Sequence, residues 1–220
     1  LLWQSPPLLS APANTMRLEN VHKQQLQIPA KTGKKARVIR IVPEQILTEA
    51  DYMLPEVQAG FVVSDTRRDI LKLAVWERHG GNGNTGVGLV HGFGLKRGAL
   101  ASTVAHDSHN LIVVGADDRD MLAAAVALQE VGGGLAVVAD GEVKALLPLP
   151  LAGLMSDQNT EFVQHKLQQL HFWAAELGVP ENVNAFNCLS FLALPVIPRL
   201  RLSDKGLVDV DQFALVDLWE

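Results

Sequence analysis

Short apolar runs that alternate with polar residues recur along the chain, and this two-residue repeat is typical of β-strands. The clearest case is the segment ILKLAVW, in which Leu71, Leu73 and Val75 alternate with the residues between them. Similar strands are predicted at 18–28, 36–42, 86–94, 98–104, 111–114, 135–139 and 143–147, with a shorter apolar run at 59–63. Asp140-Gly141, a pair typical of a two-residue hairpin, joins the last two strands of this series.

Two segments instead follow the repeat of an α-helix. The first begins with the acidic run DDRD, which suits the positive end of a helix dipole, and ends at Gly132. The second carries apolar residues at steps of three and four, and Gly178 and Pro180 end it. We expect Ser156 or Asp157 to cap its start. The last part of the chain is predicted to be irregular, with one or two short strands.

Many strands joined by short turns, with few helices between them, predict an α+β domain. We expect about eight strands in antiparallel or mixed β-sheets with segregated helices, which is a layered α/β sandwich and not a TIM barrel. Prolines at three positions and no periodicity predict that 1–16 is a linker or extended arm. This leaves 17–220 as the folded domain.

The composition of the 220 residues, 48% hydrophobic and 20% charged, is that of a globular protein and excludes disorder or a coiled coil. The net charge of -5 excludes a strongly basic surface for nucleic acid. No apolar run approaches the roughly 18 residues that a membrane span needs. The single Cys188 lies among apolar residues and is predicted to be buried and inert. One thiol and no recognisable signal peptide favour the cytoplasm.

The strand predicted at 86–94, GVGLVHGFG, has glycine or Val90 at every even position and larger residues at the odd positions. Because successive side chains point to opposite faces of a strand, one face is almost bare. Glycine inside a strand marks the close approach of another backbone, a sheet or a ligand. We favour tight packing of another element, and a ligand or a subunit interface remains the alternative.

The main candidate for chemistry is AHDSHN, which holds His106, Asp107, His109 and Asn110 between two apolar strands. Imidazole and carboxylate groups are common ligands of Zn, Mn and Fe. Two histidines three positions apart can reach one ion on a turn, whereas a strand would point them to opposite faces. A metal site needs three or four ligands. The spacing therefore leaves open the alternative that these residues only make local turn hydrogen bonds.

The second candidate is Glu77-Arg78-His79, which precedes the glycine-rich loop GGNGN. The guanidinium of Arg78 can hold an anionic or purine-like ligand through two hydrogen bonds, and the alternative is a surface ion pair worth at most about 1 kcal/mol. Glu77, His79 and His91 are further candidate metal ligands. The sequence contains no P-loop and no GxSxG, HxH or HExxH motif, and GVGLVHG is not a dinucleotide-binding fingerprint.

Several long segments resemble the C-terminal domain of bacterial adenine deaminase. They are ILKLAVWERH, GLVHGFGLKRGALASTVAHDSHNLIVVGADDRDM and GGGLAVVADGEVKALLPLPLAGLMSD within 70–157, SFLALPVIPRLRLSDKGLVDV at 190–210, and the earlier NTMRL and ARVIRIVPEQILTE. The resemblance covers almost all of the chain after about residue 14. At His91 the chain departs from the lysine expected in the family.

The resemblance implies an adenine aminohydrolase of the amidohydrolase superfamily, in which a metal-activated hydroxide converts adenine to hypoxanthine and ammonia. It implies Mn or Fe, or alternatively Zn, in the intact enzyme, held mainly by a (β/α)8 barrel that precedes this domain. Such a barrel takes about 250 residues, more than this chain contains. We therefore expect the chain to be the C-terminal domain, inactive alone, which supports or caps the active site in an enzyme of purine salvage.

Within that setting, the candidate catalytic residues are His106, Asp107 and His109, and the two histidines are also the candidate metal ligands. The residues expected to contact the substrate or to orient these three are Glu77, Arg78, His79, Ser108 and Asn110. The expected partners are the barrel domain, adenine and a second copy of the enzyme, without nucleic acid or a membrane. The alternatives are a structural or oligomerisation module and a stand-alone domain that binds a metal or a small molecule.

Overall fold

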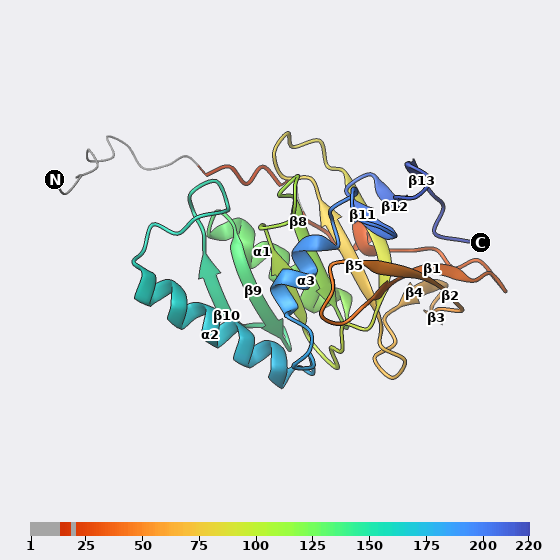
Figure 1. The fold of residues 1–220 in the computed structure, drawn as a ribbon, viewed down its shortest axis with the longest axis horizontal. Helices are drawn as coiled ribbons and strands as arrows, with labels where there is room; N and C mark the ends of the chain where they lie inside the picture. The colour runs from red at the N-terminus through yellow and green to blue at the C-terminus, as the bar shows by residue number, and fades with distance from the viewer. Residues whose placement is uncertain (1–13, 19–20) are drawn as a thin grey trace.

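An eight-stranded mixed sheet forms the centre of the computed structural model, which describes residues 14–18 and 21–220 (Figure 1). In spatial order, its strands are β10 (Glu142–Pro148), β9 (Gly134–Ala139), β7 (Ala99–Ser102), β8 (Leu111–Gly115), β5 (Ile70–Trp76), β6 (Thr85–His91), β1 (Ala36–Ile41) and β2 (Thr48–Met53). All neighbouring strands are antiparallel except β1 and β6, which are parallel. The predicted α+β class is confirmed, and the described strands do not close into a barrel.

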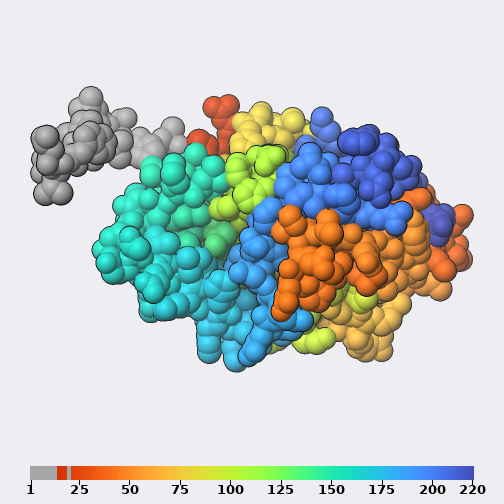
Figure 2. All heavy atoms as spheres, in the orientation of Figure 1, coloured from red at the N-terminus to blue at the C-terminus, as the bar shows by residue number. Residues whose placement is uncertain are grey.

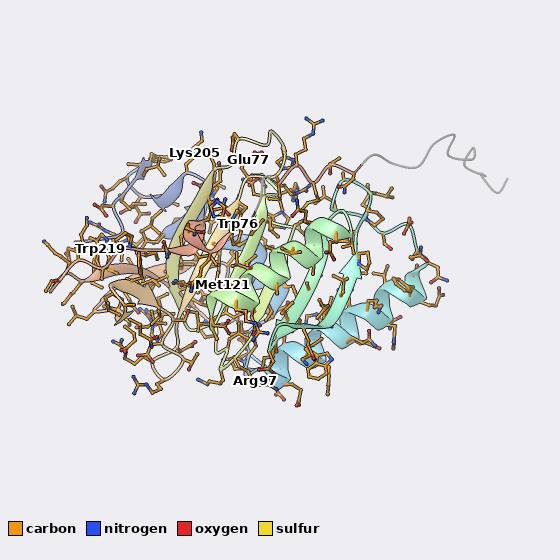
Figure 3. The ribbon with its side chains drawn as sticks, turned by 180° about the vertical axis from the view of Figure 1, so that it is seen from behind. Trp76, Glu77, Arg97, Met121, Lys205 and Trp219 are labelled. Atoms are coloured by element: carbon orange, nitrogen blue, oxygen red, sulfur yellow. The ribbon has the colours of Figure 1, made fainter. Side chains whose placement is uncertain are left out.

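Helices cover both faces of this sheet. One face carries α1 (Asp118–Glu130), which lies in front of the sheet in Figure 3, and the 3-10 helix η1 (Lys23–Leu26). The other face carries α2 (Thr160–Glu176) and α3 (Ala185–Phe191). The smaller strands are β3 (Glu56–Gln58), β4 (Phe61–Val63), β11 (Leu200–Ser203), β12 (Gly206–Asp209) and β13 (Ala214–Leu215). Among the described residues, every helix is too short or too polar to span a membrane.

The alternation along β5 divides the core into two layers. Its odd-numbered apolar residues pack with those of α2 and α3, whereas Ala74 and Trp76 pack with α1. All seven residues of β5 are buried, including Lys72. The ammonium of Lys72 lies 2.8 Å from a carboxylate oxygen of Asp118, which compensates for part of the cost of burying its charge. The strand predicted from this alternation is therefore confirmed.

The hairpin of β11 and β12 covers the glycine-bare face of β6. A side chain at Gly86 would meet the carbonyl oxygen of Ser203 in the hairpin, and one at Gly88 would touch the Leu202 side chain. The glycines thus allow two backbones to approach each other closely. Tight packing of another element is confirmed, so this part of the face is not open to a ligand or a second subunit.

Two expectations about secondary structure need correction, and further parts of the chain were not predicted or lie outside the described residues. The strand predicted at 18–28 is wrong, because the side chain of Gln25 accepts a hydrogen bond from the backbone N–H of His22 and closes a 3-10 turn, while residues 19–20 lie outside the described residues. The cap of α2 is Asn159, which accepts from the N–H of Phe162, and not Ser156 or Asp157. Helix α3 and the strands β2 and β3 were not predicted at all. The arm predicted at 1–16 lies mostly outside the described residues.

Replacing Gly86 by alanine should lower the free energy of unfolding by about 2–3 kcal/mol, because the added methyl group meets the backbone of β11. The matched control is Gly88→Ala, whose methyl group meets only the end of the Leu202 side chain at 3.3 Å. That side chain can move, so the loss should stay below about 1 kcal/mol. Urea unfolding measures both values, and equal losses would contradict close packing of the hairpin at Gly86.

Candidate functional site

The two candidate segments meet at one end of the sheet. Residues 77–82 follow β5, and residues 105–110 connect β7 to β8. The Nε2 atom of His79 lies 2.7 Å from the carbonyl oxygen of Ser108. We call these two segments the polar-loop cluster. Figure 3 shows Glu77 of this cluster and Lys205 of the β11–β12 turn at the same end of the molecule.

Arg78 lies at the centre of the polar-loop cluster and is fully buried. Its Nε donates to the carbonyl oxygen of His109, its Nη2 to that of Ala152 at 3.0 Å, and its Nη1 to Oγ1 of Thr15 at 3.3 Å. Burial lowers the pKa of Arg78, and the neighbouring charge of Glu77 acts in the opposite direction. The guanidinium therefore links three segments of the chain and orients the AHDSHN loop.

Glu77 closes the glycine-rich loop that follows β5. Its carboxylate accepts hydrogen bonds from the backbone N–H groups of His79 at 2.6 Å, Gly80 at 2.7 Å and Asn82 at 3.3 Å. Partial burial alone would raise the pKa of Glu77, but these hydrogen bonds outweigh it and hold the pKa below its ordinary value. The ionised carboxylate thus shapes the loop through backbone N–H groups, and not through an ion pair with Arg78.

The AHDSHN segment forms a turn, as convergence of its histidines would require. His109 has a φ of +51°, and its N–H donates to the carbonyl oxygen of Ala105. The rings of His106 and His109 lie edge to face with their centroids 5.8 Å apart. In the described part of the chain, however, no group of three or more His, Cys, Asp or Glu side chains could hold a metal ion. His91 lies on β6 instead, where its Nδ1 contacts Asp51 at 2.9 Å.

Two buried polar atoms of the cluster have no hydrogen-bond partner among the described residues. They are Nδ1 of His109 and Oδ1 of Asn110. Burial first, and then the charges of His106 and Arg78, lower the pKa of His109, so its ring is neutral at pH 7. A neutral imidazole offers one donor and one acceptor nitrogen. Because Asp107 and Ser108 are exposed beside it, the cluster can offer polar contacts to a molecule outside the domain.

Asp204 completes the support of this surface and was missed by the sequence analysis. It lies in the turn between β11 and β12, where its two carboxylate oxygens accept from the side-chain amides of Asn110 at 3.2 Å and Asn84 at 3.3 Å. The segment SDKG predicts a tight turn. Nothing in this segment predicts that Asp204 bonds to residues 94 and 120 positions earlier in the chain.

Residues 14–18 run along the polar-loop cluster at the same edge of the molecule (Figure 1). The backbone N–H of Arg17 donates to the carbonyl oxygen of Arg78 at 2.9 Å, and the backbone of Arg17 also lies against Gly81. Together with the Thr15 contact to the Arg78 guanidinium, these contacts fix the first described residues against the loop that follows β5. The polar surface and the N-terminal segment of the domain are therefore adjacent.

Fold and site together define a layered α+β domain that carries a polar surface beside its N-terminal segment. A family model described as the adenine deaminase C-terminal domain matches residues 45–214. The chain belongs to this family, as its sequence segments predicted.

Curated relatives extend the similarity over nearly the whole chain. The chain is 54% identical over 203 residues to adenine deaminase 2 of Carboxydothermus hydrogenoformans, which covers 92% of this chain and 35% of that protein. It is 53% identical over 204 residues to the adenine deaminase of Desulfatibacillum aliphaticivorans, and 46% identical over 209 residues to that of Bacillus pumilus. The chain spans 35–36% of the length of these relatives, to whose C-terminal domain it corresponds.

Removing the Arg78 guanidinium should destabilise the domain strongly. Arg78→Met leaves two carbonyl oxygens and one hydroxyl without their charged donor, so we expect a loss of about 2–4 kcal/mol in the free energy of unfolding. Arg97→Met is the matched control, because Arg97 makes an exposed ion pair with Asp140 worth at most about 1 kcal/mol. Chemical denaturation measures both losses. A loss in Arg78→Met no larger than in Arg97→Met would contradict a stabilising role for the hydrogen bonds of the Arg78 guanidinium.

The lowered pKa of His109 predicts a pH dependence of stability. The folded state binds its proton less readily than the unfolded state, whose reference pKa is 6.5. The free energy of unfolding should therefore fall as the pH drops from 6.5 through the lower pKa of the folded state. In His109→Asn this part of the fall should disappear. Unfolding curves between about pH 8 and pH 5 test this, and identical pH slopes for both proteins would contradict it.

Proposed function

We propose that this chain is the C-terminal domain of an adenine deaminase and that its polar-loop cluster forms part of the wall of the active site. The reaction is a hydrolysis, in which water adds to the purine carbon that bears the amine and ammonia leaves to give hypoxanthine. Support comes from the family and from relatives named adenine deaminase, of whose length the chain covers about a third. On this proposal the chain has no activity by itself.

One observation carries the proposal for the site. The polar-loop cluster combines exposed polar groups with buried atoms that have no partner among the described residues, and it lies beside residues 14–18. A cluster with a purely structural role is expected to satisfy its buried polar atoms internally. Nδ1 of His109 and Oδ1 of Asn110 can instead bond to adenine or to groups of the preceding domain when the loop that buries them shifts.

A metal ion enters this proposal only through the rest of the enzyme. Mn or Fe, or alternatively Zn, would lower the pKa of a bound water molecule and so supply hydroxide near neutral pH. His106 and His109 do not provide the three or four ligands that such an ion needs, and no third group joins them among the described residues. We therefore assign no metal ligand to this chain and give these histidines a role in binding the substrate or orienting its neighbours.

The side chains of the cluster suit recognition of a purine. The neutral ring of His109 can exchange hydrogen bonds with a ring nitrogen or the amine of adenine. The exposed carboxylate of Asp107 can take a proton from the attacking water and pass it to the amine, which then leaves as ammonia. Arg78, Glu77 and Asp204 hold the loops that present these two groups.

The proposed partners are an amidohydrolase barrel in the same polypeptide, adenine and a second copy of the enzyme, and the proposed setting is purine salvage in the cytoplasm. A structural module is the second candidate function. It is favoured by Arg78, each of whose side-chain nitrogens bonds to another part of the domain. The two candidate functions make different predictions for His109 and Asp107, which lie in the loop that Arg78 orients. Substitutions there lower activity if the cluster lines the active site, and leave activity unchanged if the domain is only structural.

His109→Asn in the full-length enzyme should lower kcat/KM for adenine by at least about tenfold, the loss of one hydrogen bond made to the reacting substrate. His165→Asn is the matched control, because His165 is exposed on α2 and lies outside the cluster. It should leave kcat/KM within about twofold. Chromatographic quantification of hypoxanthine measures the rates, and unfolding curves establish that each variant is folded.

Asp107→Asn tests the same surface without changing a buried group. If its carboxylate acts on the departing amine, kcat should fall by about tenfold or more, while KM changes less. Values of kcat/KM within twofold of wild type for both Asp107→Asn and His109→Asn would reject the active-site role and leave the structural module.

A further inference from the structure

A pocket of about 320 Å³ lies between the β1–β2 connection and α3. Figure 2 shows these two parts of the chain, far apart in sequence, lying against each other on one face of the molecule. Residues 41–48 form one wall, and residues 181–192 form most of the other. Its volume lies at the lower end of the range found for small-molecule sites, about 300–1,000 Å³.

Arg201 lines this pocket and is fully buried. Its Nε donates to the carbonyl oxygen of Ile197 at 2.8 Å, and its Nη2 donates to those of Ile46 at 2.6 Å and Pro198 at 3.0 Å. Its Nη1 is buried and has no hydrogen-bond partner among the described residues. Two of the three nitrogens are therefore committed to the protein, and the third is not.

The charge of Arg201 also lacks a counterion in the described part of the chain. Burial lowers its pKa to about 10, and among the described residues only the nearby thiol of Cys188 acts in the opposite direction. Burial raises the pKa of Cys188 to about 12, so this thiol is neutral at pH 7 and supplies no negative charge. A buried cation is costly unless an anion or a full set of acceptors surrounds it.

The rest of the lining is amphipathic. Ile46, Leu47 and Phe191 contribute apolar surface, and Asn184 and Asn187 contribute polar groups. The two acidic residues of the lining, Glu44 and Glu181, are both exposed. Water and salt screen their charges, whereas the charge of Arg201 is buried and acts at close range. The arrangement thus favours a small molecule with a negative group at one end and an apolar body.

We propose that this pocket binds a small organic carboxylate, whose carboxylate bonds to Nη1 of Arg201 and whose apolar body lies against Ile46 and Phe191. Nη1 is shielded from water, so the ligand reaches it when the exposed connection at 43–47 shifts outward. The pocket adjoins the polar-loop cluster through Phe191, whose ring centroid lies 4.9 Å from that of His106, but no residue of the cluster lines it. The proposal does not depend on the proposed function.

Calorimetric titration of the full-length protein with benzoate and with benzamide tests the proposal. The two molecules have nearly the same shape, but only benzoate carries the charge that complements the guanidinium. Benzoate should bind at least about tenfold more tightly than benzamide, as expected for a charge-assisted hydrogen bond over a neutral one. Equal affinities, or no benzoate binding up to about 10 mM, would overturn the proposal.

Arg201→Met should abolish the preference for benzoate, but it also removes bonds to three carbonyl oxygens and can unfold the domain. Asn187→Asp is therefore the second variant, because Asn187 is exposed, lines the pocket and makes no side-chain hydrogen bond to the described part of the chain. Its added negative charge should weaken benzoate binding by about fivefold or more and leave benzamide unchanged.

Gln168→Glu is the matched control for Asn187→Asp. It adds the same charge at an exposed position of α2 that does not line the pocket. Benzoate affinity should stay within about twofold of wild type in this variant. An equal weakening by both variants would show that benzoate responds only to the net charge of the protein and would overturn the pocket as its binding site.

Discussion

Two buried guanidinium groups, on Arg78 and Arg201, fix the loops at the two candidate sites of this domain. Neither has a carboxylate partner among the described residues, and their bonds go to backbone carbonyl oxygens and, at Arg78, to one hydroxyl. Because an unpaired buried donor is costly, the chain around each arginine is held in the shape that presents these oxygens. The conformation of loops with little regular structure therefore depends on one side chain in each case.

The strands of the large sheet could be predicted because burial on one or both faces leaves a period of two in the sequence, as in β5. Caps were harder, because Ser156, Asp157 and Asn159 are equally good candidates and only the tertiary structure selects Asn159. Helix α3 has seven residues, fewer than two full turns, and its apolar run has no clear helical period. Short elements of this kind depend on what they pack against.

The chemistry of the candidate site could be predicted from residue types, but its assembly could not. His109 and Arg78 stand out in the sequence, and the family resemblance places both among characteristic segments. The contact in which the Arg78 guanidinium binds the carbonyl oxygen of His109 spans 31 positions, so no local pattern predicts it. Asp204 and Arg201 were missed because their partners lie up to 155 positions away, and no local pattern records such pairs.

The β1–β2 edge of the sheet is completed late during synthesis, because residues from 200 onward hold it in place. Strands β5 to β10 lie between residues 70 and 148 and pair only antiparallel with one another, so they can associate as they leave the ribosome. The β1–β2 edge instead depends on hydrogen bonds to residues 200–219. Arg37 bonds to the carbonyl oxygens of Asp217 and Trp219, the latter labelled in Figure 3, and Thr48 to that of Leu200. A ribosome stalled before residue 200 would therefore hold a domain with one unfinished edge, open to pairing with a neighbouring nascent chain.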